Sequence, residues 1–244
     1  MSVSSLFLRA VPAPHDWDDA RATPAALVRA RIFDAIIRAV ADKGYAAATV
    51  ADITARSHIS RRTFYEHFAD KEECFLLAYE AACRATLREI ATATEKIPAA
   101  DWRARLTVAL ETYIGVLAED PDLAQVTLID ILGGGPRALA LREQILENYI
   151  DFYRRLSVRA RQAGAVAPVP DVFLRGIVGA IAEIVQHELM ANRARGLPSL
   201  VPTLVTFTLT LLGDHPGTSE PIDGTSAAPV GQPNPEGQHP APNS

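Results

Sequence analysis

Residues 49–75 read TVADITARSHISRRTFYEHFADKEECF, and three helix starts lie within this stretch. Thr49 and Asp70 are each followed three residues later by an acidic residue, which is the capping-box pattern of a helix N-terminus. Ser60 is a third residue of a type that caps helices. The stretch therefore predicts two short helices joined by a tight turn, followed by the start of a longer helix.

The two short helices, expected over residues 49–57 and 60–68, are too short to be stable alone, so they must pack against other helices. A longer helix precedes them, because Thr23-Pro24 is typical of a helix start and Lys43-Gly44 of a helix end. The apolar side chains of these three helices recur at helical spacing and predict one shared core. They are Leu27, Ala30, Phe33, Ile36, Ile37, Val40, Val50, Ile53, Ile59, Phe64 and Phe68.

Two short helices joined by a tight turn, the second with a polar outer face, form a helix-turn-helix. The second helix of such a pair enters the major groove of DNA, where arginine binds guanine edges bidentately. The helix N-termini behind Thr49 and Asp70 offer further backbone N–H groups to phosphates. This geometry predicts DNA binding, and the side chains expected to face outward are Arg61, Arg62, Thr63, Tyr65 and His67.

Residues 25–83 resemble the DNA-binding domain of the tetracycline-repressor (TetR/AcrR) family. The resemblance is carried by the Thr-Val start, the Ser-x-x-Thr-aromatic-Tyr-x-x-Phe pattern and the Asp-Lys-Glu step, all in register. Two positions depart from the family. His58 stands where glycine is usual in the turn, and histidine tolerates the left-handed backbone there at some cost in stability. Arg62 stands where glycine is frequent, which bears on the base sequence that is read rather than on DNA binding itself.

Each residue expected to contact DNA has a plainer explanation beside it. Arg61 and Arg62 also fit an exposed charged helix face, and Tyr65 also fits half-buried packing, whereas the resemblance implies a phosphate contact. His67 stays open between packing at the rim and contact. Lys71 lies near a helix start, where a cation opposes the helix dipole, so a phosphate partner explains it better than helix stability. The complete expected set is Thr49, Ser60, Arg61, Arg62, Thr63, Tyr65, His67 and Lys71.

The rest of the chain also reads as helical, which makes the expected fold class all-α. A helix from Asp70 to about Glu95 is expected first, and later helices at about 101–119, 121–132, 137–163, 170–194 and 198–212. Proline and glycine steps separate them, including Asp120-Pro121 and the Gly133–Pro136 break. Only VTFTLTLL at residues 205–212 has enough β-propensity to leave helix or strand open.

Four regions follow from this pattern. Residues 1–22 read as a flexible N-terminal arm and residues 23–83 as the helix-turn-helix domain. Residues 84–212 have the length and helix content of the family's larger ligand-binding and dimerisation domain. Residues 213–244 are rich in Pro, Gly and Ser and nearly free of large apolar residues, which predicts a disordered tail.

The larger domain is expected to bind an unknown apolar or aromatic small molecule that releases DNA. Its helices carry many large apolar side chains, which fit either an ordinary core or the cavity that the resemblance implies. The residues expected to line it are Trp102, Tyr113, Leu128, Tyr149 and Phe152. A homodimer is also expected, because one recognition helix reads too few base pairs. The helices at about 170–194 and 198–212 are expected to form its interface, and the interface residues expected on the first are Phe173, Ile177, Ile181 and Ile184.

Composition is that of an ordinary globular protein, with 48% hydrophobic and 22% charged residues and a net charge of −5. No apolar run is long enough to span a bilayer, and the N-terminus lacks the pattern of a secretory signal, so a cytoplasmic protein without membrane contact is expected. Cys74 and Cys83 match no metal or redox spacing, and no metal or cofactor is expected.

Catalysis is not expected. His187-Glu188 resembles the start of a zinc-protease motif, but Ala191 stands where the second histidine would be. Gly133-Gly134-Gly135 lacks the Gly-Lys-Ser/Thr of a phosphate loop. The prediction is a sequence-specific DNA-binding transcriptional regulator, expected to act as a repressor on double-stranded operator DNA. The alternative is a helical small-molecule or protein-binding module without specific DNA recognition.

Overall fold

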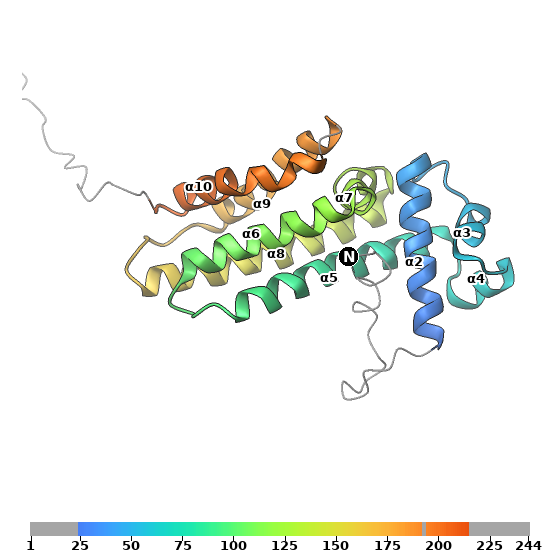
Figure 1. Ribbon diagram of the computed structural model, residues 1–244, viewed down its shortest axis with the longest axis horizontal. Coiled ribbons are helices and arrows are strands. Elements are labelled where there is room, and N and C mark those ends of the chain that lie inside the picture. Colours follow the sequence, from blue (N-terminus) through green and yellow to red (C-terminus); the bar gives the residue numbers. More distant parts are fainter. Residues whose placement is uncertain (1–23, 192–193, 215–244) are drawn as a thin grey trace, which may run out of the picture. The chain divides into compact units, whose positions relative to one another are not determined.

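The computed structural model describes residues 24–191 and 194–214. Every regular element in this part of the chain is helical, which confirms the all-α prediction. The first four helices are α2 (Pro24–Lys43), α3 (Val50–Ser57), α4 (Arg61–His67) and α5 (Lys71–Glu95) (Figure 1). The others are α6 (Trp102–Glu119), α7 (Pro121–Leu128), the 3-10 turn η1 (Asp130–Gly133), α8 (Pro136–Gln162), α9 (Asp171–Met190), the 3-10 helix η2 (Ala194–Leu200) and α10 (Val201–Leu211).

Three expected boundaries differ from the structure. The helix expected over 121–132 is divided into α7 and η1, and the helix expected to 194 ends at Met190. The segment before α10 is the 3-10 helix η2, which contains Pro198, a residue without a backbone N–H to continue an α-helix. The open segment 205–212 is helical to Leu211, and two of its threonine hydroxyls donate to carbonyls one turn back, Thr206 to Pro202 at 3.0 Å and Thr210 to Thr206 at 2.9 Å.

The core of the N-terminal helices is aromatic. Phe64 of α4 and Phe68, which follows that helix, are buried together, with ring centroids 5.6 Å apart. Phe33 of α2 meets Phe68 at 5.8 Å, and Ile53 of α3 is fully buried in the same cluster. These contacts hold the two short helices against α2, as their sequence spacing predicts.

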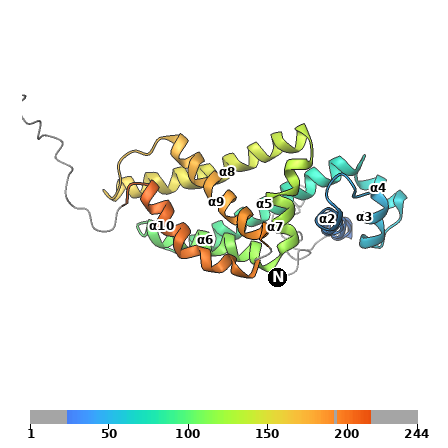
Figure 2. The same ribbon diagram turned by 90° about the horizontal axis from the view of Figure 1, so that it is seen from above.

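Helix α5 belongs to two parts of the structure. Its first turns contribute Phe75 to the aromatic core, and its later turns run along α6 and α8 (Figure 1). In both views α6 and α8 are neighbours, and α9 and α10 pack on the side of them away from α5 (Figure 2). The position after residue 83, where a domain boundary was expected, falls within this continuous helix.

The expected N-terminal arm and almost all of the expected C-terminal tail lie outside the described residues. Two residues of residues 213–244, Gly213 and Asp214, are described. Asp214 accepts two hydrogen bonds from Arg103 of α6, from Nε at 2.6 Å and from Nη2 at 2.5 Å. This bidentate pair attaches the end of α10 to the start of α6.

Candidate nucleic-acid interface and cavity

The start of α3 is fixed by a complete capping box. The Thr49 hydroxyl accepts from the backbone N–H of Asp52 at 3.2 Å, and the Asp52 carboxylate accepts from the backbone N–H of Thr49 at 3.0 Å. A hydrogen bond from Lys43, together with those from Thr49, lowers the pKa of Asp52 to about 2. Because this folded pKa lies below the ordinary value, the stabilisation is present above about pH 4 and is lost as pH falls towards 2.

The turn between α3 and α4 has the backbone expected from its sequence. His58 has φ 53° and ψ 45°, a left-handed conformation, and it is the single described non-glycine residue with positive φ. Its neighbour Ser57 is buried, and the hydroxyl of Ser57 donates to the carbonyl of Ile53 at 2.7 Å. Arg31 of α2 donates to the carbonyl of Ser57. The turn is therefore held at its first residue, and the strain falls on His58.

Replacing His58 with glycine is expected to raise the free energy of unfolding by roughly 0.5–1 kcal/mol, because glycine adopts positive φ without steric conflict. Urea unfolding of the variant beside the natural protein measures the change. The matched control is Glu66→Gly inside α4, where the same new residue is expected to lower stability by about 1 kcal/mol. A loss of stability in His58→Gly would contradict the description of the turn.

Helix α4 presents a polar face above an aromatic core. Ser60 caps it, since its hydroxyl accepts from the backbone N–H of Thr63 at 3.0 Å and lies 2.9 Å from the hydroxyl of Thr63. Arg61 is exposed and makes no hydrogen bond or ion pair within the described part of the chain. Arg62 is 90% exposed and pairs with Glu66 one turn later at 3.1 Å. An exposed i,i+4 pair of this kind contributes about 0.3–0.5 kcal/mol, so both guanidinium groups are available for a partner.

Tyr65 and His67 differ in exposure. Tyr65 is 56% exposed, and its ring lies nearly perpendicular to that of Phe64, with 5.3 Å between the ring centroids. His67 is half-buried against Phe68, with ring centroids 6.2 Å apart. This geometry favours an external contact for Tyr65 and packing at the rim for His67.

Lys71 has a structural role that its sequence position did not indicate. Its ammonium donates to the backbone carbonyls of Tyr45 at 2.7 Å and Ala48 at 2.8 Å. It also lies 4.4 Å from the centroid of the Tyr45 ring. Lys71 therefore joins α5 to the loop after α2, which is a structural reason for this lysine besides the expected phosphate contact. A phosphate contact by its remaining N–H stays a prediction.

A second feature that the sequence did not indicate is an ion-pair cluster between α2 and α7. Arg38 of α2 donates to both carboxylate oxygens of Asp120, at 2.7 and 2.6 Å, and to Asp122 at 2.7 Å. Asp120 is 7% exposed and also caps α7, accepting from the backbone N–H of Leu123 at 2.9 Å. Spacings of more than 80 residues hide such a pair from any local pattern.

A cavity lies between α5, α6, α7, α8 and α9, and its lining is mostly apolar. The space open to the centres of water molecules measures about 80 Å³. One water needs roughly 10–15 Å³ of such space, so several waters or part of a slender molecule fit. Four of the five residues expected in a pocket line it, namely Tyr113, Leu128, Tyr149 and Phe152.

The fifth residue expected in the pocket, Trp102, does not line the cavity. It is 2% exposed and packs in the core of the larger helical region. The guanidinium of Arg103 lies 4.6 Å from the centroid of its ring. Its indole nitrogen has no hydrogen-bond partner within the described residues. An aromatic residue at a helix start cannot be assigned to core or cavity from sequence alone.

The hydroxyl groups of the cavity are hydrogen-bond donors. Burial raises the pKa of Tyr113, Tyr149 and Tyr153 above the ordinary value of tyrosine, so all three stay protonated. Their hydroxyls make no hydrogen bond in the described part of the chain, although Tyr153 is only 6% exposed. A protonated hydroxyl that reaches the free space of the cavity can donate a hydrogen bond to a molecule bound there.

The expected interface residues on α9 differ in burial. Ile177 and Ile181 are 0% and 4% exposed and belong to the core of this chain, so assigning them to a partner contact was wrong. Phe173 is 48% exposed, and Ile184 is half-buried against the core. The outward face of α9 carries Val172, Phe173, Gly176, Gly179 and Glu183 instead.

The other motifs considered in the sequence form no catalytic or metal site in the described part of the chain. Within residues 24–191 and 194–214, no group of three or more His, Cys, Asp or Glu side chains could hold a metal ion. Gly133 ends η1, and Gly135 with φ 85° precedes α8, so the glycine run forms a helix break. No helix of the described chain is long and apolar enough to cross a membrane.

These features define a class of protein. An exposed recognition helix, a fixed left-handed turn and two capped helix starts form a helix-turn-helix beside a helical region with its own cavity. Residues 32–78, which include the whole of α3 and α4, match the family of bacterial regulatory proteins described as the tetR family. The helix-turn-helix of this chain is therefore of the kind found in that family, and the chain is a DNA-binding transcriptional regulator.

Individual relatives share the rest of the fold. A fatty acid metabolism regulator protein of Bacillus subtilis (strain 168) is 24% identical over 179 residues, 70% of this chain and 88% of the relative. FadR, the fatty acid degradation regulator of Bacillus halodurans, has a TM-score of 0.71 at 20% identity, covering 78% of this chain and 96% of its own. FadR of Bacillus subtilis in complex with stearoyl-CoA has a TM-score of 0.68 at 19% identity, covering 74% and 97%.

Proposed function

We propose that this regulator is a repressor that leaves its operator when its cavity binds an acyl compound with a long unbranched chain. The observation that carries the proposal is a mostly apolar cavity whose walls include α5 and α7, the two helices that also contact α2 of the helix-turn-helix region. The relatives described as regulators of fatty acid metabolism, one of them crystallised with stearoyl-CoA, support the same ligand class.

The proposed DNA contacts lie on α4 and at the helix starts around it. Arg61 and Arg62 read base edges in the major groove, since they are the exposed guanidinium groups of the recognition helix. Thr63 and Tyr65 contact base or phosphate beside them, and Thr49 contacts phosphate at the N-terminus of α3. Ser60 acts chiefly as the cap that sets the position of α4.

The lining of the cavity suits the chain of an acyl compound. It is mostly apolar and includes Leu87, Ile90 and Leu110, against which methylene groups can pack. Apolar burial contributes about 0.8 kcal/mol per methylene group, so affinity should rise with chain length until the cavity is filled.

Entry of a chain must move the helices that line so small a space. Helix α7 contributes Leu123, Thr127 and Leu128 to the cavity, and its capping residue Asp120 holds Arg38 of α2. Displacement of α7 therefore acts on α2, and through it on α3 and α4. A ligand can release DNA only if it binds better to the arrangement that no longer fits the operator, and this connection supplies such a difference.

Fluorescence anisotropy tests the proposal. DNA fragments retained by the purified protein give the operator, and the labelled operator is then titrated with saturated acyl compounds of increasing chain length. We expect release by long chains and no release by short ones at equal concentration. If no acyl compound both binds the protein and dissociates the operator, the ligand part of the proposal fails and DNA binding remains.

A homodimer is proposed through the outward faces of α9 and α10. Gly176 and Gly179 on α9 are exposed, and a Cβ atom added at either would meet nothing within 4 Å in the described chain. Glycine inside a helix costs up to about 1 kcal/mol relative to alanine, and packing within this chain gives no reason for that cost. Close approach of a second helix, with Phe173 and Phe207 as apolar neighbours, does give one.

Gly179→Arg is expected to produce a monomer at micromolar concentration and to lower operator affinity about 100-fold. The dimer binds two linked half-sites of the operator, whereas a monomer binds only one. Light scattering gives the oligomeric state, and anisotropy gives the affinity. The matched control is Gly133→Arg, at an exposed glycine whose added Cβ also meets nothing within 4 Å. A dimeric Gly179→Arg variant with full operator affinity would place the interface elsewhere.

A further inference from the structure

Arg142 is the one charged side chain among the residues that line the cavity. It lies on the same stripe of α8 as Ile145, Leu146 and Tyr149, which follow it at helical spacing and line the cavity too. Its side chain is 27% exposed, so the guanidinium lies at the boundary between cavity and solvent. A cation in this position beside an otherwise apolar space calls for an anionic partner.

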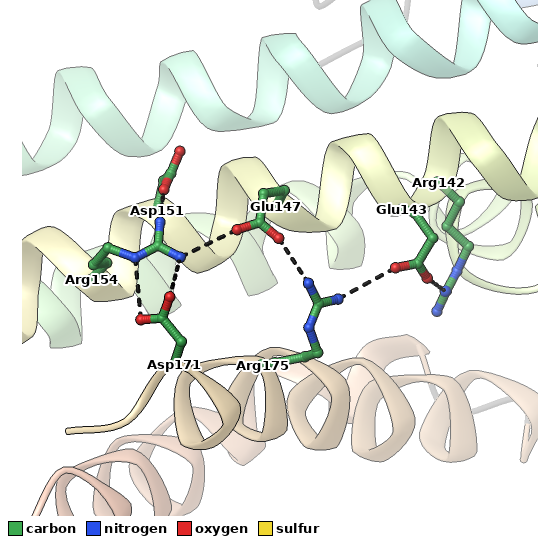
Figure 3. Close-up of polar contacts among 7 residues, drawn as sticks. All are labelled: Arg142, Glu143, Glu147, Asp151, Arg154, Asp171 and Arg175. Atoms are coloured by element: carbon green, nitrogen blue, oxygen red, sulfur yellow. Dashed lines mark hydrogen bonds and ion pairs between the residues drawn. The ribbon is translucent and has the colours of Figure 1, made fainter.

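The partners of Arg142 within the protein are weak. Figure 3 shows a row of ion pairs between α8 and α9, with Arg142 at one end (Figure 3). Its only described ion pair is with the neighbouring Glu143, at 3.5 Å from Nη1, and Glu143 also pairs with Arg175 at 3.3 Å. By contrast, Arg154 in the same row binds Asp171 through two contacts, the shorter at 2.9 Å.

The charged residue of the lining lies towards one end of the cavity. Helices α5 and α8 run in the same direction from the helix-turn-helix side, so Tyr79 and Arg142, in the early turns of the two helices, belong to the same end (Figure 1). Farther along these helices the lining is uncharged and includes Ile90 and Tyr153. Tyr149 follows Arg142 by two turns of α8, and its hydroxyl, whose pKa is raised by burial, can donate to an oxygen of a ligand.

We propose that Arg142 binds the anionic end of the acyl ligand and thereby selects compounds with a charged head group over neutral ones of equal chain length. The shared chemistry is a negatively charged group on the head of an acyl compound. It is either the carboxylate of a free fatty acid or a phosphate of an acyl thioester of coenzyme A. The selection rests on the acyl ligand proposed above, and it adds the residue that determines the head group.

The orientation of the ligand follows from this contact. With its head at Arg142, the chain extends between α5 and α8 towards Ile90, away from the helix-turn-helix side. Leu123, Thr127 and Leu128 of α7 then lie along the chain rather than at its tip. The head group also competes with Glu143 for Arg142, which releases Glu143 to Arg175 alone.

Isothermal titration calorimetry on the full-length protein tests the assignment with dodecanoate, dodecanoyl-coenzyme A and dodecanol. A charge-assisted hydrogen bond lost on substitution corresponds to about 10- to 100-fold in affinity. We expect the natural protein to prefer an anionic compound over dodecanol by about that factor. Arg142→Gln should remove the preference and leave the Kd for dodecanol unchanged. The anionic compound that binds the natural protein more tightly, and loses more in the variant, identifies the source of the anion.

Two further variants serve as controls for Arg142→Gln. Arg175→Gln removes the other partner of Glu143 without touching the cavity lining, and we expect it to keep the preference for the anion. Arg142→Lys keeps the charge and should keep most of the preference, which decides the question if Arg142→Gln does not fold. The inference is overturned if Arg142→Gln keeps the full preference for an anionic compound over dodecanol. It is also overturned if the natural protein has the same Kd for dodecanol as for the anionic compounds. Absence of binding by all three compounds would instead overturn the proposed acyl ligand.

Discussion

Replacing both Arg61 and Arg62 with alanine is expected to remove sequence-specific DNA binding while the protein stays folded. Each guanidinium that binds a guanine bidentately contributes about 1–3 kcal/mol of discrimination, so the double variant should lose about 2–6 kcal/mol for the operator. The fold should be almost unaffected, because both side chains are exposed and the Arg62–Glu66 pair is weak. Anisotropy with the operator and with a shuffled sequence, at one salt concentration, measures the loss.

The control for this variant is Arg84→Ala on α5. The Arg84 side chain is 58% exposed and pairs with Glu80 one turn earlier at 2.9 Å, so it is an exposed arginine with a similar ion pair outside the recognition helix. We expect no change in operator affinity from this control. Operator affinity equal to that of the natural protein in the double arginine variant would refute the proposed assignment of α4 as the helix that reads bases.

Asp120→Ala is expected to lower the free energy of unfolding by about 3–4 kcal/mol. It removes the cap of α7, worth about 1 kcal/mol, and leaves Arg38 without its bidentate partner in a partly buried site. The value for the ion pair is reduced from that of a fully buried pair, because the Arg38 side chain is 30% exposed. Urea unfolding followed by circular dichroism gives the change.

Asp122→Ala is the control, because it removes a carboxylate from the same guanidinium of Arg38 without removing the cap of α7. Asp122 binds the same guanidinium at 2.7 Å but is 49% exposed and does not cap α7, so its loss should cost less than about 1 kcal/mol. The Asp120 variant should also weaken the coupling between acyl compounds and DNA, measured as the ratio of operator affinities with and without ligand. Equal losses of stability in the two aspartate variants would show that Asp120 has no special position.

The helix-turn-helix could be predicted almost completely because its information is local. Capping residues such as Thr49 and Ser60 mark helix starts within three residues of sequence, and His58 marks the left-handed turn. The core of the helix-turn-helix could also be predicted, because Phe64 and Phe68 lie on one face of a short helix that has no second apolar face. The structure agrees with each of these predictions.

The larger helical region was less predictable because its decisive contacts are not local. An apolar stripe on α9 shows that Ile177 and Ile181 are buried, but not whether this chain or a partner covers them. The aromatic residues of α6 and α8 raise the same difficulty, which is why Trp102 was assigned to a pocket that it does not line. The contact of Arg38 with Asp120 joins residues that no spacing rule connects.

The pair between Arg38 and Asp120 has a consequence for the engineering of hybrid biosensors. Exchange of the first helices between family members, to join one operator specificity to another inducer, would carry Arg38 away from the residue that receives it. A hybrid that keeps Asp120 but gains an uncharged residue opposite it would bury an unpaired carboxylate. Operator specificity can therefore be moved from one regulator to another only if α2 and the N-terminus of α7 are transferred together. More than 80 residues separate these two elements in the chain.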